Sequence, residues 1–329
     1  MGADMSLNTG QTSKGASSPC WVLLGPTASG KTELSLLLAR RFPVEIVSVD
    51  SMQVYGGMDL GTAKPGPAVL REVPHHMIGV VEPDEQFSVG RFRCMAVEAI
   101  EGIWARGRRP LLVCGTPLYL KALLWGLFPG PGADAGIRQH LREQAAWHGT
   151  GRLHSILSRV DPLAAERIGP RDLKRIERAL EVYELTGQPI SARQYQFQGP
   201  PQIEHVAVGL RFPRSVLYKR IDHRVDRMME GGLLEEVRRL RGRLGPQAGQ
   251  AVGFRELVAY LDGQCSLAEA VDRIKRNTRR LAKHQITWFR HFPQVRWIDI
   301  GENLGLEGIA DRCGNAFVEP CTSGGFELS

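Results

Sequence analysis

The sequence predicts an α/β protein, in which a parallel β-sheet carries helices on both faces and an all-helical domain is inserted into the chain. Two observations predict this fold. Short apolar runs alternate with helical segments in the N-terminal third, and such alternation is typical of a parallel sheet. Strand patterns then vanish between residues 134 and about 198, and they return at 206–210 and 295–299.

A glycine-rich loop follows the first predicted strand, residues 21–24. It spells G-x-x-x-x-G-K-T over residues 25–32, and a helix is predicted over 33–42. In this context the backbone N–H groups of a P-loop surround phosphate oxygens, which predicts a P-loop NTPase-like sheet. The predicted phosphate-binding residues are Gly25, Pro26, Thr27, Ala28, Ser29, Gly30, Lys31 and Thr32, and the hydroxyl of Thr32 is expected to bind Mg²⁺ as cofactor. The loop alone leaves open whether the phosphate belongs to a nucleotide.

The other strands of this core place polar residues at their carboxyl ends. Strands are predicted over 44–49, 77–81 and 110–114, with a helix over 88–106 and another that ends near residue 125. The ligand crevice of an open parallel sheet lies beyond the carboxyl ends of its strands. Gly25, Asp50 and Thr116 follow such ends, so we expect them to converge on one site.

The predicted elements divide the chain into five segments. Residues 1–18 are expected to form a disordered leader, 19–133 and 201–301 the core, 134–200 the helical insertion, and 302–329 a flexible tail. Helices of the insertion are predicted over 135–148, 152–159, 162–168 and 171–186. In the second part of the core, helices are predicted over 215–231, 233–243, 253–261 and 266–292.

Composition narrows the class of protein. The chain carries 42 Lys and Arg against 35 Asp and Glu, which suits an RNA partner without proving one. Its six cysteines include no C-x-x-C pair, which argues against a disulfide framework or zinc module and for the reducing cytoplasm. No apolar stretch approaches the roughly 20 residues of a membrane span, so no membrane association is expected.

Three motifs together resemble the tRNA dimethylallyltransferase (tRNA isopentenyltransferase) family: GPTASGKT at 25–32, DSMQVY at 50–55 and GTAKP at 61–65. Further matches are GTPLY at 115–119, RIERALE at 175–181, VGFRE at 252–256 and RLAKHQITWFR at 280–290. The resemblance covers residues from about 24 to 297. It implies transfer of the dimethylallyl group of dimethylallyl diphosphate to N6 of adenosine 37, beside the anticodon of tRNA, with release of diphosphate.

The chemistry of that reaction favours a base at the strand end. Adenine N6 is a poor nucleophile, so attack on an allylic carbon benefits from a carboxylate that accepts the N6 proton. Asp50 is the predicted base; the alternatives are a structural cap or a Mg²⁺ ligand. Gln53 carries the donor and acceptor needed to read an adenine edge, unless it is an ordinary surface glutamine.

The departing diphosphate calls for cations beside the P-loop. By family analogy Thr27 reaches the side of the bridging oxygen and Arg220 clamps the diphosphate, which makes both catalytic candidates with Asp50. Arg224 lies one helical turn after Arg220 and is a further diphosphate candidate. The alternative is that Arg220 is exposed and paired with Asp222 or Asp226. Lys121 is a weaker candidate, which a solvated helix position explains equally well.

The anticodon stem-loop of tRNA is expected to lie between the core and the insertion, with phosphate contacts from basic helices and stacking on aromatic side chains. The target nucleotide must leave its stack to reach Asp50. The predicted tRNA-binding residues are Asp50, Ser51, Met52, Gln53, Thr116, Arg138, Lys174, Arg175, Ile176, Glu177, Arg178, Gly253, Phe254, Arg255, Arg279, Arg280, Lys283, His284, Gln285, Trp288 and Arg290.

Two other classes of function compete with this interpretation. A small-molecule kinase would use ATP in the same loop, although it would not need the arginine-rich C-terminal helix. A non-catalytic RNA-binding protein would not need Lys31 and Thr32. The protein is expected to act as a monomer, and which tRNAs it modifies stays open.

Overall fold

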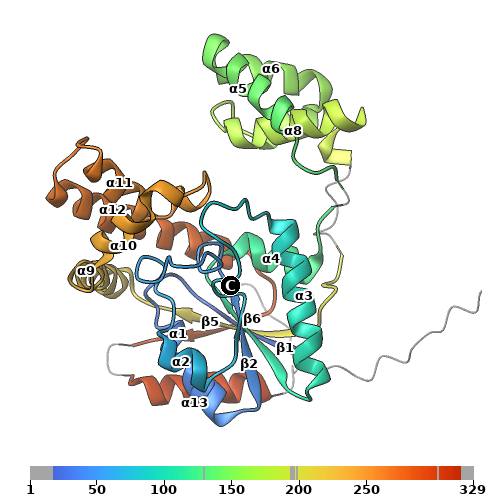
Figure 1. The fold of residues 1–329 in the computed structure, drawn as a ribbon. Helices are drawn as coiled ribbons and strands as arrows, with labels where there is room; N and C mark the ends of the chain where they lie inside the picture. Colours follow the sequence, from blue (N-terminus) through green and yellow to red (C-terminus); the bar gives the residue numbers. More distant parts are fainter. Residues whose placement is uncertain (1–17, 129, 193–196, 198, 302–303, 320–329) are drawn as a thin grey trace, which may run out of the picture. The chain divides into compact units, whose positions relative to one another are not determined.

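The computed structural model describes residues 18–128, 130–192, 197, 199–301 and 304–319 (Figure 1). The chain divides into a core unit, Met1–Leu120 with Ile203–Ser329, and an insertion unit, Lys121–Gln202. The insertion unit therefore begins earlier than residue 134. Of the expected leader, only Ser18 lies among the described residues.

Six parallel strands form the sheet of the core unit in the order β3-β2-β4-β1-β5-β6. Strands β1 and β2 are buried along their whole length, as the continuous apolar runs require of a sheet covered on both faces. The predicted parallel α/β fold is confirmed. The strands are β1 (Cys20–Leu24), β2 (Val44–Val49), β3 (His75–His76), β4 (Arg109–Cys114), β5 (His205–Arg211) and β6 (Val295–Asp299).

The prediction of a third strand at 77–81 was wrong. The strand ends at His76 because Met77 adopts a left-handed backbone conformation, with φ of 64°, which interrupts the pairing with β2. Val81 instead bridges Tyr55, so this apolar segment packs against the loop that follows β2. Apolar composition alone does not separate a paired strand from a buried loop.

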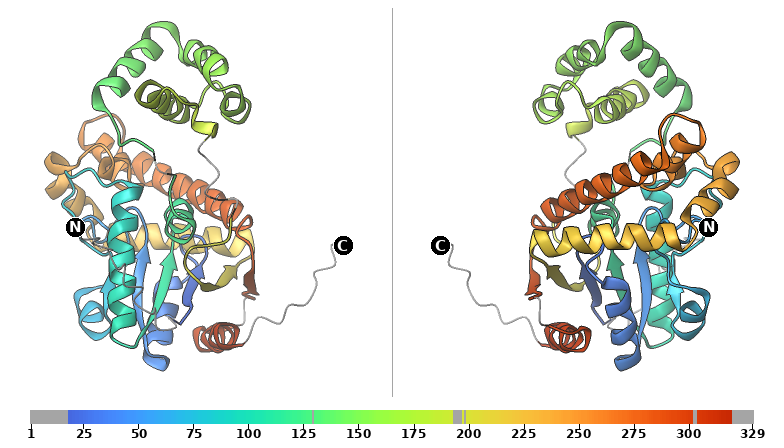
Figure 2. Two further views of the ribbon diagram at one scale, coloured as in Figure 1. Left: turned by 90° about the vertical axis from the view of Figure 1, so that its right-hand side faces the viewer. Right: turned by 90° about the vertical axis from the view of Figure 1, so that its left-hand side faces the viewer.

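Helices cover both faces of the sheet (Figures 1 and 2). Trp21 and Leu23 face the cluster formed with α1 and α13, whereas α3 packs on β2 and β4 from the other face. The helices of the core are α1 (Lys31–Arg41), α2 (Pro67–Glu72), α3 (Val89–Ala105), α9 (Arg214–Glu230), α10 (Leu233–Leu240), α11 (Phe254–Leu261), α12 (Leu267–Phe289) and α13 (Leu306–Val318), while α4 (Pro117–Trp125) runs from the core into the insertion unit.

The expectation of a flexible tail was wrong for residues 306–318, which form α13. Its Phe317 ring stacks on Trp21 with 4.6 Å between centroids, and Arg41 of α1 forms ion pairs with Glu307 and Asp311. The apolar residues of α13 recur at helical spacing and bury Ile309 and Cys313 against the sheet. Residues 302–303 and 320–329 lie outside the described part of the chain.

The insertion unit contains α5 (Ala135–His148), α6 (Thr150–Val160), α7 (Pro162–Arg167) and α8 (Leu173–Thr186), followed by a short 3₁₀ turn, Ile190–Ala192. Asp134, Asp161 and Asp172 cap three of these helices, each accepting a hydrogen bond from a backbone N–H of the first turn. The unit packs around its own apolar cluster, which includes Leu153, Leu157 and Ile176. No strand occurs in the described residues of this unit.

Candidate active site

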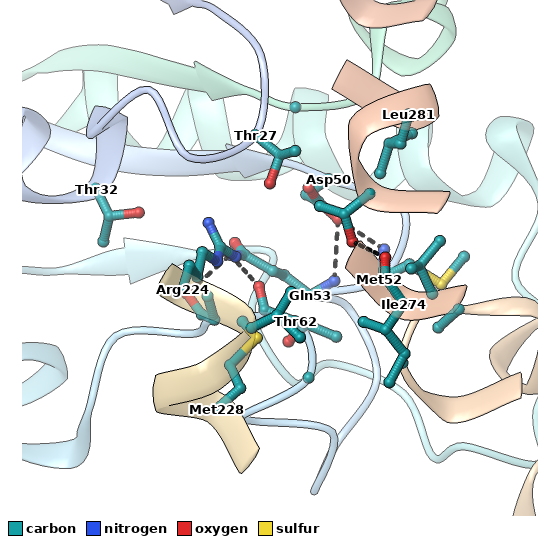
Figure 3. A pocket seen from close by; sticks show the side chains of 18 of the residues that line it. Thr27, Thr32, Asp50, Met52, Gln53, Thr62, Arg224, Met228, Ile274 and Leu281 are labelled. Atoms are coloured by element: carbon teal, nitrogen blue, oxygen red, sulfur yellow. Dashed lines mark hydrogen bonds between the residues drawn. The ribbon is translucent and has the colours of Figure 1, made fainter. Parts of the chain in front are cut away.

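A pocket opens at the carboxyl ends of β1, β2 and β4, where the P-loop, the loop after β2 and the turn after β4 meet (Figure 3). Thr27, Asp50 and Arg224 point into the same space. Its lining includes Thr27, Lys31, Thr32, Asp50, Met52, Gln53, Thr62, Gly115, Arg224, Gly253 and Gln285, together with the apolar side chains of Val225, Met228, Leu233, Ile274 and Leu281. Segments far apart in the sequence thus form one site.

The P-loop holds its lysine against its own backbone. The ammonium group of Lys31 donates to the carbonyl oxygens of Gly25 at 2.8 Å and Pro26 at 2.9 Å. Burial lowers the pKa of Lys31 to about 8. Gly30 has a φ of 84°, and α1 starts at the next residue, so the N-terminal end of the helix faces the loop. The site therefore combines free helix N–H groups with a cation, as anion binding requires.

Two arginines of α9 lie on the same side of this loop, in the lining of a second pocket that includes residues 28–33. Nε of Arg220 donates to the carbonyl oxygen of Ala28 at 2.9 Å. The acidic partners considered for Arg220 are used otherwise: Asp222 pairs with Arg279 and Asp226 with Lys275, both of α12. Arg220 is thus exposed, as the alternative stated, but it lies at the P-loop and pairs with neither aspartate.

Arg224 differs from its neighbour because no carboxylate or carbonyl of the described chain forms an ion pair or hydrogen bond with it. Burial lowers the pKa of its guanidinium. A desolvated cation without a partner is costly, and an anionic ligand in the pocket would remove that cost.

The two oxygens of Asp50 have different surroundings. Oδ1 accepts hydrogen bonds from the backbone N–H groups of Met52 at 2.9 Å and Gln53 at 3.3 Å, which close the turn after β2. Oδ2 accepts no hydrogen bond from the described residues and lies against Gly115, where a Cβ atom would come within 2.5 Å of it. One oxygen therefore serves the turn, while the other stays available to accept a proton.

Gln53 is half-buried and its amide is used inside the core. Its Oε1 accepts from the hydroxyl of Ser48 at 2.7 Å, and its Nε2 donates to the carbonyl oxygens of Thr62 at 3.2 Å and Ala63 at 3.4 Å. The side chain therefore ties the DSMQVY segment to the GTAKP loop. Neither a surface glutamine nor a free reader of an adenine edge describes this arrangement.

Glu236 of α10 is a site-supporting residue that the sequence did not reveal. Its carboxylate is only 4 % exposed and accepts hydrogen bonds from the backbone N–H groups of Asp59, Leu60 and Gly61, between 2.8 and 3.0 Å. These bonds hold the start of the GTAKP loop, which lines the pocket through Thr62. In the sequence Glu236 stands in a charged helix among arginines and another glutamate, a pattern typical of a solvated face.

Lys121 is not brought to the phosphate loop. It belongs to the insertion unit, and its ammonium group lies 4.3 Å from the centroid of the Phe197 ring. It lines neither of the pockets described above. This cation–π contact stabilises the charge of Lys121 within the insertion unit. A purely solvated helix position therefore does not fully describe Lys121 either.

The predicted tRNA-binding residues fall into two groups. Ile176 and Phe254 are fully buried and Glu177 is 5 % exposed, so these side chains build the fold and are not free to contact RNA. The sequence motifs include these residues because buried supporting residues and surface residues alternate at helical spacing. Arg138 and Arg178 donate to Glu181, and Arg255 and Arg279 pair with Glu256 and Asp222.

The other group lies at the surface or around the pocket. The exposed side chains are Lys174, Arg175, Arg280, Lys283, His284, Trp288 and Arg290. Thr116 accepts a hydrogen bond from the backbone N–H of Ser51 at 3.0 Å, which joins the turns after β2 and β4. Gln285 is buried, with both ends of its amide bonded inside the core. Their roles in RNA binding stay predictions.

No helix of the described residues is long and apolar enough to span a membrane. No group of three or more His, Cys, Asp or Glu side chains in this part of the chain could together hold a metal ion.

Family models and known proteins match most of the chain. The IPP transferase model matches residues 53–292, and the isopentenyl transferase model matches residues 19–77. The tRNA dimethylallyltransferase of Symbiobacterium thermophilum is 50 % identical, over 86 % of this chain and 89 % of that protein. That of Pelotomaculum thermopropionicum is 43 % identical, over 95 % and 99 % of the two chains.

Solved structures agree with these matches. The full-length tRNA isopentenylpyrophosphate transferase of Bacillus halodurans is 41 % identical and superposes with a TM-score of 0.66, covering 91 % of this chain and 96 % of that one. A eukaryotic dimethylallyltransferase acting on tRNA is 27 % identical, with a TM-score of 0.73 over 90 % and 77 % of the chains. The motifs, the pocket that they build and these likenesses lead to one conclusion: this chain belongs to the tRNA dimethylallyltransferase family.

Proposed function

We propose that this enzyme transfers the dimethylallyl group of dimethylallyl diphosphate to N6 of adenosine 37 in tRNA and releases diphosphate. The observation that carries the proposal is the pairing, within one pocket, of a phosphate-binding loop with the free Oδ2 of Asp50. The apolar wall formed by Val225, Met228 and Leu233 offers a surface for the prenyl group. The relatives named above are tRNA dimethylallyltransferases, and one solved relative acts on tRNA.

In the proposed reaction, a bond forms between N6 and C1 of the prenyl group while the bond from C1 to the diphosphate oxygen breaks. The N6 proton passes to Oδ2 of Asp50. Lys31, Arg220 and Arg224 stabilise the negative charge that develops on the departing diphosphate. Backbone N–H groups that hold Oδ1 keep the carboxylate oriented while Oδ2 accepts the proton.

The pocket also fits the proposed Mg²⁺ cofactor. The hydroxyl of Thr32 lines the pocket and forms no hydrogen bond with another described residue, so a hard oxygen ligand is available there. Mg²⁺ commonly uses one or two protein oxygens and completes its coordination with water and substrate phosphates. Held by Thr32, the ion would neutralise charge on the diphosphate.

The experiment that tests the function is mass analysis of nucleosides from unmodified tRNA, after incubation with the enzyme, Mg²⁺ and dimethylallyl diphosphate. The expected result is a dimethylallyl adenosine from the anticodon loop, formed only when all components are present. Absence of any mass gain on the tRNA, together with ATP-dependent phosphorylation of a small metabolite, would support the kinase alternative and overturn the proposal. A direct comparison of ATP and dimethylallyl diphosphate binding separates the same two functions.

We also propose that the enzyme acts as a monomer in the cytoplasm, in keeping with the free thiols and the absence of a membrane-spanning helix among the described residues. Sedimentation at working concentration with and without tRNA tests the first part, and fractionation of cells tests the second. A sedimenting dimer, or activity in the membrane fraction, would contradict the respective part.

A further inference from the structure

Gln285 links two segments of the pocket that are distant in the sequence. Its Oε1 accepts a hydrogen bond from the backbone N–H of Thr27 in the P-loop at 2.8 Å. Its Nε2 donates to the carbonyl oxygen of Gly115, in the turn after β4, at 2.6 Å. The side chain is 5 % exposed, so both bonds are shielded from water.

The turn that Gln285 holds is the one against which Asp50 packs. A Cβ atom at Gly115 would lie 2.5 Å from Oδ2 of Asp50 and 4.0 Å from Nε2 of Gln285. Only glycine leaves room for this close approach. The contacts therefore run without a break from the P-loop through Gln285 and Gly115 to the carboxylate oxygen that is free to accept a proton.

Gln285 sits on α12, which lies beside α9 in both views of Figure 2. Two ion pairs, from Lys275 to Asp226 and from Arg279 to Asp222, join these helices. Because these contacts hold α12 against α9, they also fix the position from which Gln285 extends into the pocket. A single amide meets both demands of the site because it combines one acceptor with one donor group.

We propose that Gln285 is a positioning residue, which fixes the separation between the diphosphate-binding loop and the carboxylate of Asp50. The inference rests on the proposed function and deepens it. The reacting groups must be aligned to within a fraction of an ångström, and a misplacement of about 1 Å costs on the order of 10²-fold in rate. This role differs from a direct contact with tRNA, the role that the sequence motif indicated.

The test uses two variants that differ in what they keep. Gln285→Glu keeps an acceptor for Thr27 but replaces the donor facing Gly115 with a second acceptor and adds an anion near the P-loop. Gln285→Met fills similar volume and keeps neither bond. The matched control is Gln247→Met, because Gln247 also bridges two groups, Tyr55 and Phe87, away from both pockets.

Four quantities are measured for each full-length variant: the thermal unfolding midpoint, tRNA affinity, affinity for inorganic diphosphate, and the single-turnover rate at saturating substrates. We expect tRNA affinity to stay within about twofold of wild type for both variants, and the single-turnover rate to fall about 10- to 100-fold. Diphosphate affinity should fall further for Gln285→Glu than for Gln285→Met. The control should match wild type in the single-turnover rate and in both affinities.

Two outcomes would overturn the inference if wild type modifies tRNA. Wild-type single-turnover rates in both folded variants would show that the bridge does not position the reacting groups. Lost tRNA affinity with a normal rate at saturating tRNA would assign Gln285 to RNA contact. If one variant fails to fold, the result of the other variant decides between these outcomes. If wild type does not modify tRNA, the proposed function fails, and diphosphate affinity then tests the link from Gln285 to the P-loop. An affinity equal to wild type in Gln285→Glu would overturn that link as well.

Discussion

In the core unit, Lys31 bonds only to loop carbonyls and Arg224 to no partner in the described chain, although both line the pocket. In the insertion unit, Arg138 and Arg178 donate to the fully buried carboxylate of Glu181, and Arg142 donates to Glu177. A buried carboxylate held by arginines is a complete structural unit, and removing one member destabilises the fold. Pocket cations that no carboxylate pairs with are instead available to bind an anionic ligand. The presence or absence of a paired carboxylate, rather than the charge itself, thus separates the structural arginines from the ligand-binding cations.

The largest effect is expected for Lys31→Ala, in the core. Turnover should fall about 10³-fold and diphosphate affinity should weaken, since the ammonium acts on both the bound and the departing diphosphate. Steady-state kinetics and titration with inorganic diphosphate measure the two effects. Lys219→Ala is the control, because Lys219 is an exposed lysine of α9 outside both pockets. Diphosphate affinity equal to wild type would place the substrate diphosphate elsewhere.

Asp50→Asn should lower turnover about 10²-fold and leave diphosphate affinity intact. An amide oxygen can still accept the N–H bonds of Met52 and Gln53, so the turn should keep its shape. Single-turnover prenyl transfer at saturating tRNA is the measurement. Turnover at the wild-type rate would reduce Asp50 to its role in that turn.

Glu181→Gln addresses the paired side of the comparison. Burial raises the pKa of Glu181, but hydrogen bonds from Arg138, Arg178 and the backbone of Asp134 outweigh it and leave the pKa below its usual value. The carboxylate therefore stabilises the unit above the ordinary glutamate pKa, and this stability is lost as pH falls through the depressed value. At neutral pH the variant should lose about 2 kcal/mol of unfolding free energy, less than a fully buried pair because the arginines are partly exposed.

Chemical denaturation of Glu181→Gln and diphosphate titration give the two readouts. Glu184→Gln on the exposed side of the same helix is the control and should change neither. Weakened diphosphate binding in Glu181→Gln with unchanged stability would reverse the assignment of roles.

The smallest effect concerns RNA. Replacing the exposed pair Arg280 and Lys283 by glutamine should weaken tRNA binding about tenfold and reduce its salt dependence by about one unit of slope per lost phosphate contact. Arg142→Gln, an arginine held by Glu177, is the comparison and should leave the salt slope unchanged. Equal slopes for the double variant and wild type would remove this part of α12 from the RNA-binding surface.

Much of the fold followed from the sequence because the helical and strand periods are strong. The helix at 135–148 and the strand at 295–299 were predicted with their observed bounds. The short helix α2 was missed, since its six residues, which begin with a proline, are too few to show a helical period. The helix α13 was missed although its apolar spacing was present in the tail.

The site followed in part from the motifs, since strand ends and the P-loop indicate where ligands gather. The bridging roles of Gln285, Gln53 and Glu236 were not predictable, because each depends on backbone groups whose positions only the folded loops set. The Glu177 and Glu181 network was hidden for a related reason. Helical spacing shows which charges share a face, but it does not show which of them are buried.

The thermal unfolding midpoint of wild type and Arg224→Met, with and without inorganic diphosphate, tests most directly whether the unpaired cations of the pocket are there to bind an anion. Methionine keeps the apolar stem and removes a desolvated charge that forms no ion pair or hydrogen bond with a carboxylate of the described chain. Without ligand the variant should unfold at the same temperature as wild type or higher, and diphosphate should raise its midpoint less. A variant that unfolds at a lower temperature but responds fully to diphosphate would contradict the claim that the pocket cations await an anion.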